Sequence, residues 1–225
     1  MEKGRRNAIT RRGLLAGAAV LSGRFAYAGL PVPPDSRLDF RLMRHGSQIG
    51  THAMTFSRDG EVLTVQIAVD VLVKFGPIPL VRYTHRNQEI WQRDRLVGFE
   101  SRTDRNGKPL HVKARWDGPG LAVEGTGTPR YIAPANALAT THWNSSMLRG
   151  PMIGTQDGQL VHPVVSAQPE ERIRLASGEQ IAARHYRLSG DLDFDIWYDT
   201  SDTWAGMRFA ADDGSVITYE RLPAA

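Results

Sequence analysis

The sequence contains no cysteine among its 225 residues. This absence excludes a disulfide, a thiolate metal site, an iron–sulfur cluster, a cysteine nucleophile and a lipid-modified cysteine anchor. The sequence also lacks a long amphipathic helical pattern, an internal repeat and a low-complexity segment. A chain of this length can bury a hydrophobic core without disulfide bonds.

The first 28 residues are predicted to be a twin-arginine-type signal peptide. Arg11-Arg12-Gly13 precedes a weakly apolar run that ends at Leu21, and Ala26-Tyr27-Ala28 offers small residues for cleavage. This run is too short and too poorly flanked for a transmembrane segment. The alternative is an ordinary secretory signal that happens to contain the arginine pair. Either signal predicts a protein that lies in the periplasm or is secreted after cleavage near Ala28.

The predicted signal peptide and the rest of the chain differ in net charge. Residues 1–28 carry six of the basic residues and one acid, whereas residues 29–225 carry 22 basic and 23 acidic residues. The basic surplus therefore belongs to the signal peptide. A net charge of −1 in the mature chain argues against a nucleic-acid partner.

Residues 29–36 are proline-rich and are predicted to be an extended linker, and residues 37–225 are predicted to form a single all-β domain. The dominant period is two, and Val62–Val73 shows it best, because every odd position is apolar. Other strand-like runs are Leu38–Arg44, Ile49–Ser57, Leu80–Arg86, Arg95–Thr103, Leu110–Trp116, Leu121–Gly125, Leu160–Val165, Glu171–Leu175, Ile181–Leu188, Leu192–Asp199, Thr203–Ala211 and Val216–Arg221.

The connections favour hairpins. Asn-Gly and Asp-Gly pairs between the runs predict tight turns and therefore an antiparallel meander. Phe75–Pro79 predicts a bend or a crossover, since its prolines cannot donate to a sheet. Pro134–Ala139 and Asn144–Leu148 each predict a short helix, the second with Asn144 as its N-cap. The predicted fold is a long antiparallel meander curled into a β-roll or open barrel, with a short helical insertion.

The carboxy-terminal strands allow a register to be predicted. A two-residue loop at Ser201-Asp202 places apolar residues opposite one another on one face, and a loop with Gly214 left-handed adds the next strand. The predicted pairs are Tyr198 with Ala205, Ile196 with Met207, Phe194 with Phe209, Phe209 with Ile217, and, on the other face, Asp195 with Arg208.

The seven histidines show no metal-binding spacing, so no metal and no cofactor is predicted. The alternation of residues along its strand places His85 on the apolar face. His52 shares a face with Met54 and Phe56. Buried histidines with hydrogen-bond partners are the favoured interpretation. A dispersed site formed by several histidines across strands is the alternative.

Residues 83–94 combine acid–base side chains with aromatic side chains that can stack on a ligand. His85, Glu89 and Asp94 supply a base and acids, which is the composition that a saccharide-cleaving site needs, and His142 is a further catalytic candidate. A sheet rim contains the same residue types, and no G-x-S-x-G motif supports serine hydrolysis. The candidate ligand-binding residues are Tyr83, Trp91, Trp143, Asn144 and Trp197.

Asp191, Asp193 and Asp195 alternate along one predicted strand face, about 7 Å apart. This spacing is compatible with calcium, but calcium takes its ligands from a loop that surrounds the ion. A ladder of cross-strand ion pairs with Arg208 is the favoured interpretation.

Several motifs together resemble a known family. They are Phe75-Gly76-Pro77-Ile78, Tyr83-Thr84-His85-Arg86, Glu89-Ile90-Trp91, His142-Trp143-Asn144, Arg187–Asp193 and Trp197-Tyr198-Asp199. The sequence resembles an uncharacterised family of exported bacterial proteins, a domain of unknown function, over nearly the whole mature chain. It is also similar in look to periplasmic spiral β-roll proteins. The resemblance implies a fold and a compartment, and no activity.

A curled sheet with one apolar face either fills its interior or leaves a cleft. The sequence therefore favours a non-catalytic binding or envelope-associated scaffold protein, with a lipid or another amphipathic small molecule as its partner. The alternative is a hydrolase or lyase that acts on an envelope glycan through the His85 region. A dry apolar pocket would favour binding, whereas a wet cleft that brings His85 or His142 near a carboxylate would favour catalysis. No feature of the sequence specifies an oligomeric state.

Overall fold

The computed structural model describes residues 29–75 and 78–223, and within them the chain forms β-strands and one short 3-10 helix. The predicted signal peptide lies outside the described residues. The elements are β1 (Arg37–Arg44), β2 (Ser47–Asp59), β3 (Val62–Phe75), β4 (Ile78–Gln92), β5 (Arg95–Arg105), β6 (Lys108–Trp116), β7 (Gly120–Gly125), β8 (Thr128–Pro134), β9 (Leu138–Ala139), η1 (Ser145–Arg149), β10 (Met152–Ile153), β11 (Leu160–Val161), β12 (Val164–Arg174), β13 (Gln180–Ser189), β14 (Phe194–Asp199), β15 (Trp204–Ala210) and β16 (Val216–Arg221).

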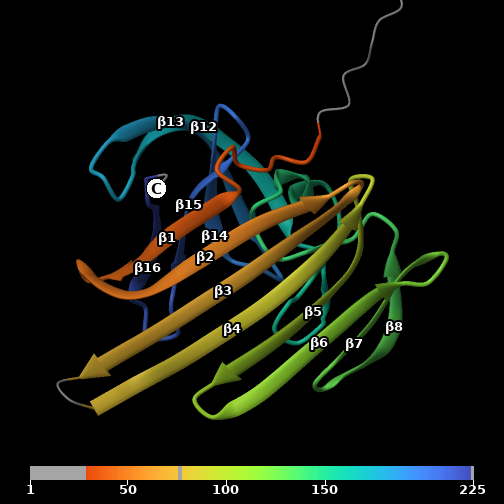
Figure 1. The fold of residues 1–225 in the computed structure, drawn as a ribbon. Coiled ribbons are helices and arrows are strands. Elements are labelled where there is room, and N and C mark those ends of the chain that lie inside the picture. The colour runs from red at the N-terminus through yellow and green to blue at the C-terminus, as the bar shows by residue number, and fades with distance from the viewer. Residues whose placement is uncertain (1–28, 76–77, 224–225) are drawn as a thin grey trace, which may run out of the picture.

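Thirteen strands form one antiparallel sheet in the order β12-β13-β14-β15-β16-β1-β2-β3-β4-β5-β6-β7-β8. The carboxy-terminal meander thus joins the amino-terminal one where β16 pairs with β1. β12 and β8 form the two ends of this order, so the described sheet is curled but not closed (Figure 1). The prediction of an all-β roll or open barrel is confirmed. No helix in the described ranges is long and apolar enough to cross a bilayer.

The period-two pattern places the core on the inner face of the curled sheet. Along β3, Leu63, Val65, Ile67 and Val69 are all buried, while the intervening positions are more exposed. Successive side chains of a strand point to opposite faces, so this alternation fixes which face is inside. The inner faces of β1, β2, β14 and β15 meet those of β3 to β7 in one hydrophobic core.

The segment between β8 and β12, residues 135–163, lies inside the curled sheet and is called the insertion below. Trp143 packs edge-on against Phe56 and Trp91, each with ring centroids 5.3 Å apart. The Tyr198 hydroxyl donates to the His142 carbonyl at 2.7 Å, and Ser101 Oγ donates to the Thr155 carbonyl. The insertion therefore fills part of the interior and ties both halves of the sheet to it.

One of the two predicted helices is correct. Ser145–Arg149 forms the 3-10 helix η1, and the Asn144 side chain caps it by accepting from Ser146 N at 3.0 Å. The predicted helix at Pro134–Ala139 is wrong, because Leu138–Ala139 forms β9 and pairs with β10 in the three-stranded sheet β11-β10-β9. A six-residue helix gains little from local hydrogen bonds, so the tertiary pairing prevails.

The β3–β4 connection is a hairpin and not a crossover. The two strands pair in antiparallel register as far as Phe75 and Ile78, with a bulge beside Lys74 that accommodates Pro79. β4 also runs to Gln92, six residues beyond the predicted end. Glu89 therefore lies within a central strand and not at a rim.

The predicted strands at Leu160–Val165 and Glu171–Leu175 have different boundaries in the structure. Leu160–Val161 is β11 of the small sheet, and Val164–Arg174 is the single strand β12. β12 contains Pro169, which the sheet tolerates because β12 is an edge strand with a register shift between Gln168 and Glu171.

Three of the five predicted carboxy-terminal pairs are present, and the register differs beside the loop. Ile196 pairs with Met207, Asp195 with Arg208, and Phe209 with Ile217, as predicted. Tyr198 pairs with Trp204 and not with Ala205, because a bulge follows a loop that is one residue longer than expected. Asp202 takes a positive φ of 63° in this loop, and Asp199 N donates to the Thr203 carbonyl at 2.9 Å.

The Asp195 carboxylate, predicted on the face opposite the apolar pairs, is largely buried. Its side chain is 14% exposed and lies 2.8 Å from His185 Nε2 and 3.2 Å from Arg208. Burial alone would raise the pKa of Asp195, but the hydrogen bonds from His185 and Arg208 and the charge of Arg187 lower it overall. Asp195 is thus a structural carboxylate on the outer face.

We expect the substitutions Ile196→Asp, Asp195→Ala and Asp70→Ala to destabilise the protein in descending order. Ile196 is fully buried, so an unpaired aspartate there should cost about 3–5 kcal/mol. Asp195→Ala removes hydrogen bonds to charged groups and should cost about 1–2 kcal/mol. Asp70 forms an exposed ion pair with Arg86, so Asp70→Ala should cost less than about 1 kcal/mol. Urea melts measure all three.

The pH dependence offers a second readout for Asp195. Because its folded pKa lies below the ordinary aspartate value of 3.8, its contribution is present above that pH and is lost as the pH falls through the folded pKa. A cost of Asp195→Ala that is independent of pH, or that exceeds the cost of Ile196→Asp, would show that the faces are assigned wrongly.

Candidate functional site

A cleft of about 760 Å³ opens on the inner side of the curled sheet. Its walls come from β1 to β5 on one side and from β14 to β16 on the other, and the insertion forms its floor through Thr141, His142 and Thr155. The apolar lining side chains include Leu42, Ile49, Val69, Val71, Val73, Leu80, Val81, Leu192, Phe194, Met207, Phe209 and Ile217.

The register of β3 and β4 shows how the cleft deepens. Val69 pairs with His85, Val71 with Tyr83, and Val73 with Val81. His85 is 4% exposed, whereas Val81 is 36% exposed. The cleft is therefore deep at His85 and shallow toward the end of the hairpin.

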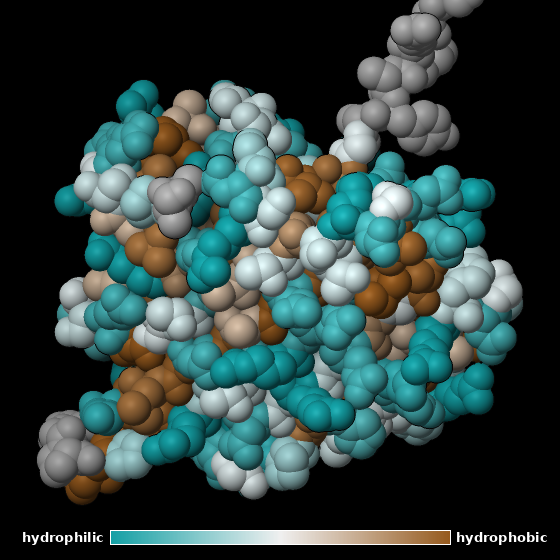
Figure 2. Space-filling view, in the orientation of Figure 1, coloured by the Kyte–Doolittle hydropathy of each residue, from teal (hydrophilic) through white to brown (hydrophobic). Residues whose placement is uncertain are grey.

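The end of the β3–β4 hairpin has apolar side chains on its surface. Leu72, Ile78, Leu80 and Val81 are exposed there, and Figure 2 shows this apolar surface at the lower left. Leu80 and Val81 also line the cleft, so the exposed apolar surface continues into the cleft lining.

Three histidines line the deep end of the cleft. His52 on β2 and His85 on β4 both pair with Val69 on β3, which places them in one row on the inner face. His142 reaches the same region from the insertion with a positive φ of 70°. The ring centroids of His52 and His142 each lie 5.2 Å from that of Trp204. The sequence placed His52 and His85 on apolar faces correctly, but not in one cleft with His142.

Glu89 is fully buried and joins the insertion to β4. Its carboxylate accepts from Trp91 Nε1 at 2.8 Å, from Trp143 Nε1 at 2.9 Å and from Thr141 Oγ1 at 2.7 Å. Burial raises the pKa of Glu89, while the three donors lower it in part. Glu89 is four residues from His85 on the same strand, about 13 Å away. It does not line the cleft.

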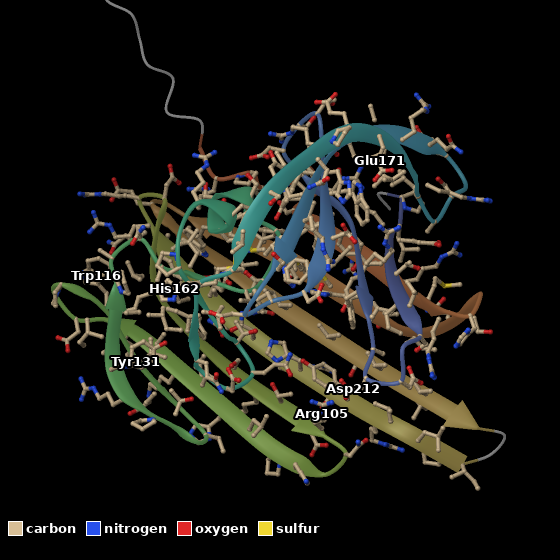
Figure 3. All side chains as sticks on the ribbon, turned by 180° about the vertical axis from the view of Figure 1, so that it is seen from behind. Arg105, Trp116, Tyr131, His162, Glu171 and Asp212 are labelled. Carbon is tan, nitrogen blue, oxygen red and sulfur yellow. The ribbon has the colours of Figure 1, made fainter. Side chains whose placement is uncertain are left out.

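The other candidate residues lie apart from the cleft. Asp94 and Arg93 both have positive φ in the exposed turn between β4 and β5. Asn144 caps η1. Trp197 lies on the outer face, where it stacks on His185 with ring centroids 4.7 Å apart and donates to Glu171 Oε1 at 2.8 Å. Figure 3 labels Glu171 on β12, far from the mouth of the cleft.

Charged side chains gather at the mouth of the cleft. Arg105 and Asp212, labelled in Figure 3, lie 3.2 Å apart there, and Arg44 forms an ion pair with Asp213. Asp193, also at the mouth, pairs with Arg187. Within residues 29–75 and 78–223, no three His, Asp or Glu side chains are grouped as metal ligands.

Sequence reasoning did not identify several cleft residues as members of a site. Phe194, Met207, Phe209 and Ile217 were predicted to share one inward face, and that parity was the available signal. Thr155 carried no signal, because its position depends on how the insertion folds inside the sheet.

The comparisons with known proteins agree with this architecture. The model of a family described as Domain of unknown function (DUF6134) matches residues 40–222. Among solved structures, the chain is similar to a beta-barrel-like protein of Domain of Unknown Function DUF1849 from Brucella abortus, with 10% identity, a TM-score of 0.58, and coverage of 83% of this chain and 94% of that chain. At this identity the likeness shows the fold alone. No curated protein matches the chain. The resemblance to an uncharacterised family with a β-rich fold is confirmed.

We expect Glu89→Ala to be severely destabilising and Glu89→Gln to be mild. Alanine leaves two buried indole N–H groups without an acceptor and should cost more than about 3 kcal/mol, whereas glutamine keeps an acceptor and should cost about 1 kcal/mol. Glu100→Gln, at an exposed acid on β5, is the control and should change stability little. Urea melts measure the free energies of unfolding.

The pH dependence follows from the raised pKa of Glu89. The folded protein holds the proton more tightly than the unfolded chain, so the contribution of Glu89 is greatest below the ordinary glutamate value of 4.5 and falls as the pH rises through the folded pKa. The cost of Glu89→Gln should therefore shrink between about pH 4 and about pH 8. A cost that grows over this range would contradict the assignment.

Proposed function

The chain belongs to the family of Domain of unknown function (DUF6134), and we propose that it is a non-catalytic binding protein whose cleft holds an apolar or amphipathic small molecule. The observation that carries the proposal is the cleft itself. Its volume of about 760 Å³ lies in the range typical of small-molecule sites. Its lining is dominated by aliphatic and aromatic side chains from both halves of the sheet.

The arrangement of carboxylates supports binding over hydrolysis. A glycan hydrolase or lyase in this cleft would need a carboxylate or another base beside His85 or His142. Glu89 is fully buried, and all of its hydrogen-bond partners belong to the protein core. The carboxylates that do line the cleft are Asp193, Asp212 and Asp213, and each is paired with an arginine at the mouth.

The proposed compartment is the periplasm or the exterior of the cell. It rests on the sequence of residues 1–28. An exported protein with an apolar cleft can bind an envelope lipid, because binding removes the apolar surface of the acyl chains from water.

Binding can be tested with N-phenyl-1-naphthylamine, an uncharged probe that fluoresces in apolar sites. The mature protein should bind it, and Val71→Trp should weaken binding at least about tenfold, because Val71 lines the cleft and the larger side chain fills it. Val164→Trp is the matched control, since Val164 is 62% exposed on the edge strand β12 and does not line the cleft.

Thermal melts must show that both tryptophan variants fold. If Val71→Trp does not fold, Val81→Trp replaces it, because Val81 lines the shallow end of the cleft and is 36% exposed. The proposal fails if the mature protein does not bind the probe, or if the cleft variant binds it as tightly as the control.

Export can be tested by replacing Arg11 and Arg12 with lysine and fractionating the cells. Accumulation in the periplasm should be lost, because the twin-arginine route requires that pair. Replacing Arg5 and Arg6 with lysine is the matched control and should leave export intact. Undiminished accumulation of the first variant would disprove the twin-arginine route while leaving export by the general secretory route open.

A further inference from the structure

The end of the β3–β4 hairpin extends past its neighbouring strands. The pairing of β3 with β2 ends at Val71, and the pairing of β4 with β5 ends at Tyr83. Beyond these two residues, within the described part of the chain, residues 72–75 and 78–82 pair as strands only with each other, and they are called the hairpin extension below. Four residues of a strand span about 13 Å, so the extension projects about that far from the sheet (Figure 1).

The hairpin extension has apolar side chains on both of its faces. Leu72 lies on the outer face, because its neighbour Val73 is buried on the inner face, and Leu80 and Val81 line the cleft. The exposed fractions are 37% for Leu72, 57% for Leu80 and 59% for Ile78. Clustered apolar side chains on a protein surface mark an interaction site. A flat protein surface covers only one face of such a ribbon, whereas the head groups and acyl chains of a bilayer surround both.

Basic side chains lie around the apolar ones. Lys74 and Arg82 belong to the hairpin extension, and Lys108 begins β6 directly after the β5–β6 turn. That turn lies against the extension, because Arg82 N donates to Asn106 Oδ1 at 2.8 Å and Asn106 N donates to the Arg82 carbonyl at 2.9 Å. All three basic side chains are exposed, and none forms an ion pair with a residue that the structure describes.

The acidic side chains of this region leave a positive surplus. Asp70 and Asp212 each form an ion pair with an arginine, at 2.8 and 3.2 Å. Asp104 accepts from Gly107 N at 2.8 Å within the β5–β6 turn, and it has no ion pair among the described residues. Three unpaired cations thus lie near one unpaired carboxylate, although residues 29–225 carry a net charge of −1. This local charge complements an anionic surface.

We propose that the hairpin extension docks the protein on a bilayer that contains anionic phospholipids, with its apolar side chains at the boundary between head groups and acyl chains and with Lys74 and Arg82 beside the phosphates. Interfacial elements bury their apolar side chains about 5–10 Å deep and gain affinity from anionic lipids. An extension of about 13 Å is long enough for this depth. Because Leu80 also lines the cleft, docking turns the mouth of the cleft toward the lipid. The docking surface goes beyond the proposed function and does not require a ligand in the cleft.

Insertion can be tested by site-specific labelling, because the chain contains no cysteine. Ile78→Cys gives the mature protein a single thiol for the environment-sensitive fluorophore nitrobenzoxadiazole. With vesicles of phosphatidylglycerol, the emission should rise and shift to shorter wavelengths, because the fluorophore leaves water. Val164→Cys, at a side chain that is 62% exposed on the edge strand β12, is the matched control and should show no shift. An unchanged spectrum at position 78, or an equal shift at both positions, would overturn the proposal.

The charge contribution can be measured by sedimentation with vesicles of phosphatidylglycerol or of phosphatidylcholine. The mature protein should bind the anionic vesicles at least about tenfold more tightly. Lys74→Gln and Arg82→Gln should each weaken that binding about fivefold, since a basic residue near an anionic surface contributes about 1 kcal/mol. Arg58→Gln and Arg115→Gln remove the same charge at the opposite ends of their strands and are the matched controls. Equal binding to both kinds of vesicle, or an equal loss in the controls, contradicts the proposal.

The apolar contribution can be measured with Ile78→Glu, and Val164→Glu is its matched control. Ile78→Glu should abolish sedimentation with phosphatidylglycerol vesicles, because it places a carboxylate at the lipid boundary. Its melting temperature should stay unchanged, since Ile78 is largely exposed. Its binding of N-phenyl-1-naphthylamine, measured without vesicles, should also stay unchanged, because Ile78 does not line the cleft. The probe measurement therefore separates a failure of docking from a failure of the proposed function.

A second copy of the chain is the other occupant that an apolar hairpin end suits. Analytical ultracentrifugation of the mature protein without vesicles should show no association that Ile78→Glu abolishes. A dimer that Ile78→Glu dissociates, together with no sedimentation on anionic vesicles, would overturn the proposal in favour of self-association. Binding of Ile78→Glu to the anionic vesicles as tightly as Val164→Glu would overturn it as well.

Discussion

The interior of the curled sheet is wider than the side chains of its own strands can fill, and the rest of the structure depends on what occupies it. The inner face of β4 shows the consequence along one strand. Trp91 and Glu89 are buried beneath the insertion, His85 lies at the boundary, and Val81 is 36% exposed. The insertion therefore fills one end of the interior and leaves the other end as the cleft. Strand alternation supplies an apolar wall at both ends, but only the insertion decides which part of that wall is covered.

Buried polar side chains join the insertion to the inner face of the sheet. Glu89 on β4 accepts from Thr141 and from two indoles, and Ser101 on β5 donates to the Thr155 carbonyl. Buried polar groups normally cost stability unless they are hydrogen-bonded. These hydrogen bonds offset the cost of burying Glu89 and Ser101, and they hold the insertion against β4 and β5.

The sequence predicted the sheet better than the site, and the reason is physical. Strand alternation and Asn-Gly or Asp-Gly turns are local signals, so the strands, the inward faces of His52 and His85, and the pairing of Ile196 with Met207 could be predicted. The length of the loop after Asp199 could not be predicted. A bulge adds one residue to a strand without changing the alternation of apolar and polar residues on either side. The position of the insertion inside the sheet could not be predicted either. It depends on long-range contacts, such as Trp143 with Phe56 and Glu89, that no local period encodes.

The separation between sheet and insertion also has a consequence for how such a protein can change its ligand. The register of the sheet is fixed over thirteen strands, and a one-residue slip would turn the inner face of a strand outward. The insertion is a long connection without extended regular structure, and such segments tolerate change better than strands do. Substitutions at Thr141, His142 or Thr155 alter the floor of the cleft, whereas the walls keep their positions. The fold therefore allows the polar end of the cleft to change while the apolar walls, and with them the preference for an apolar chain, remain in place.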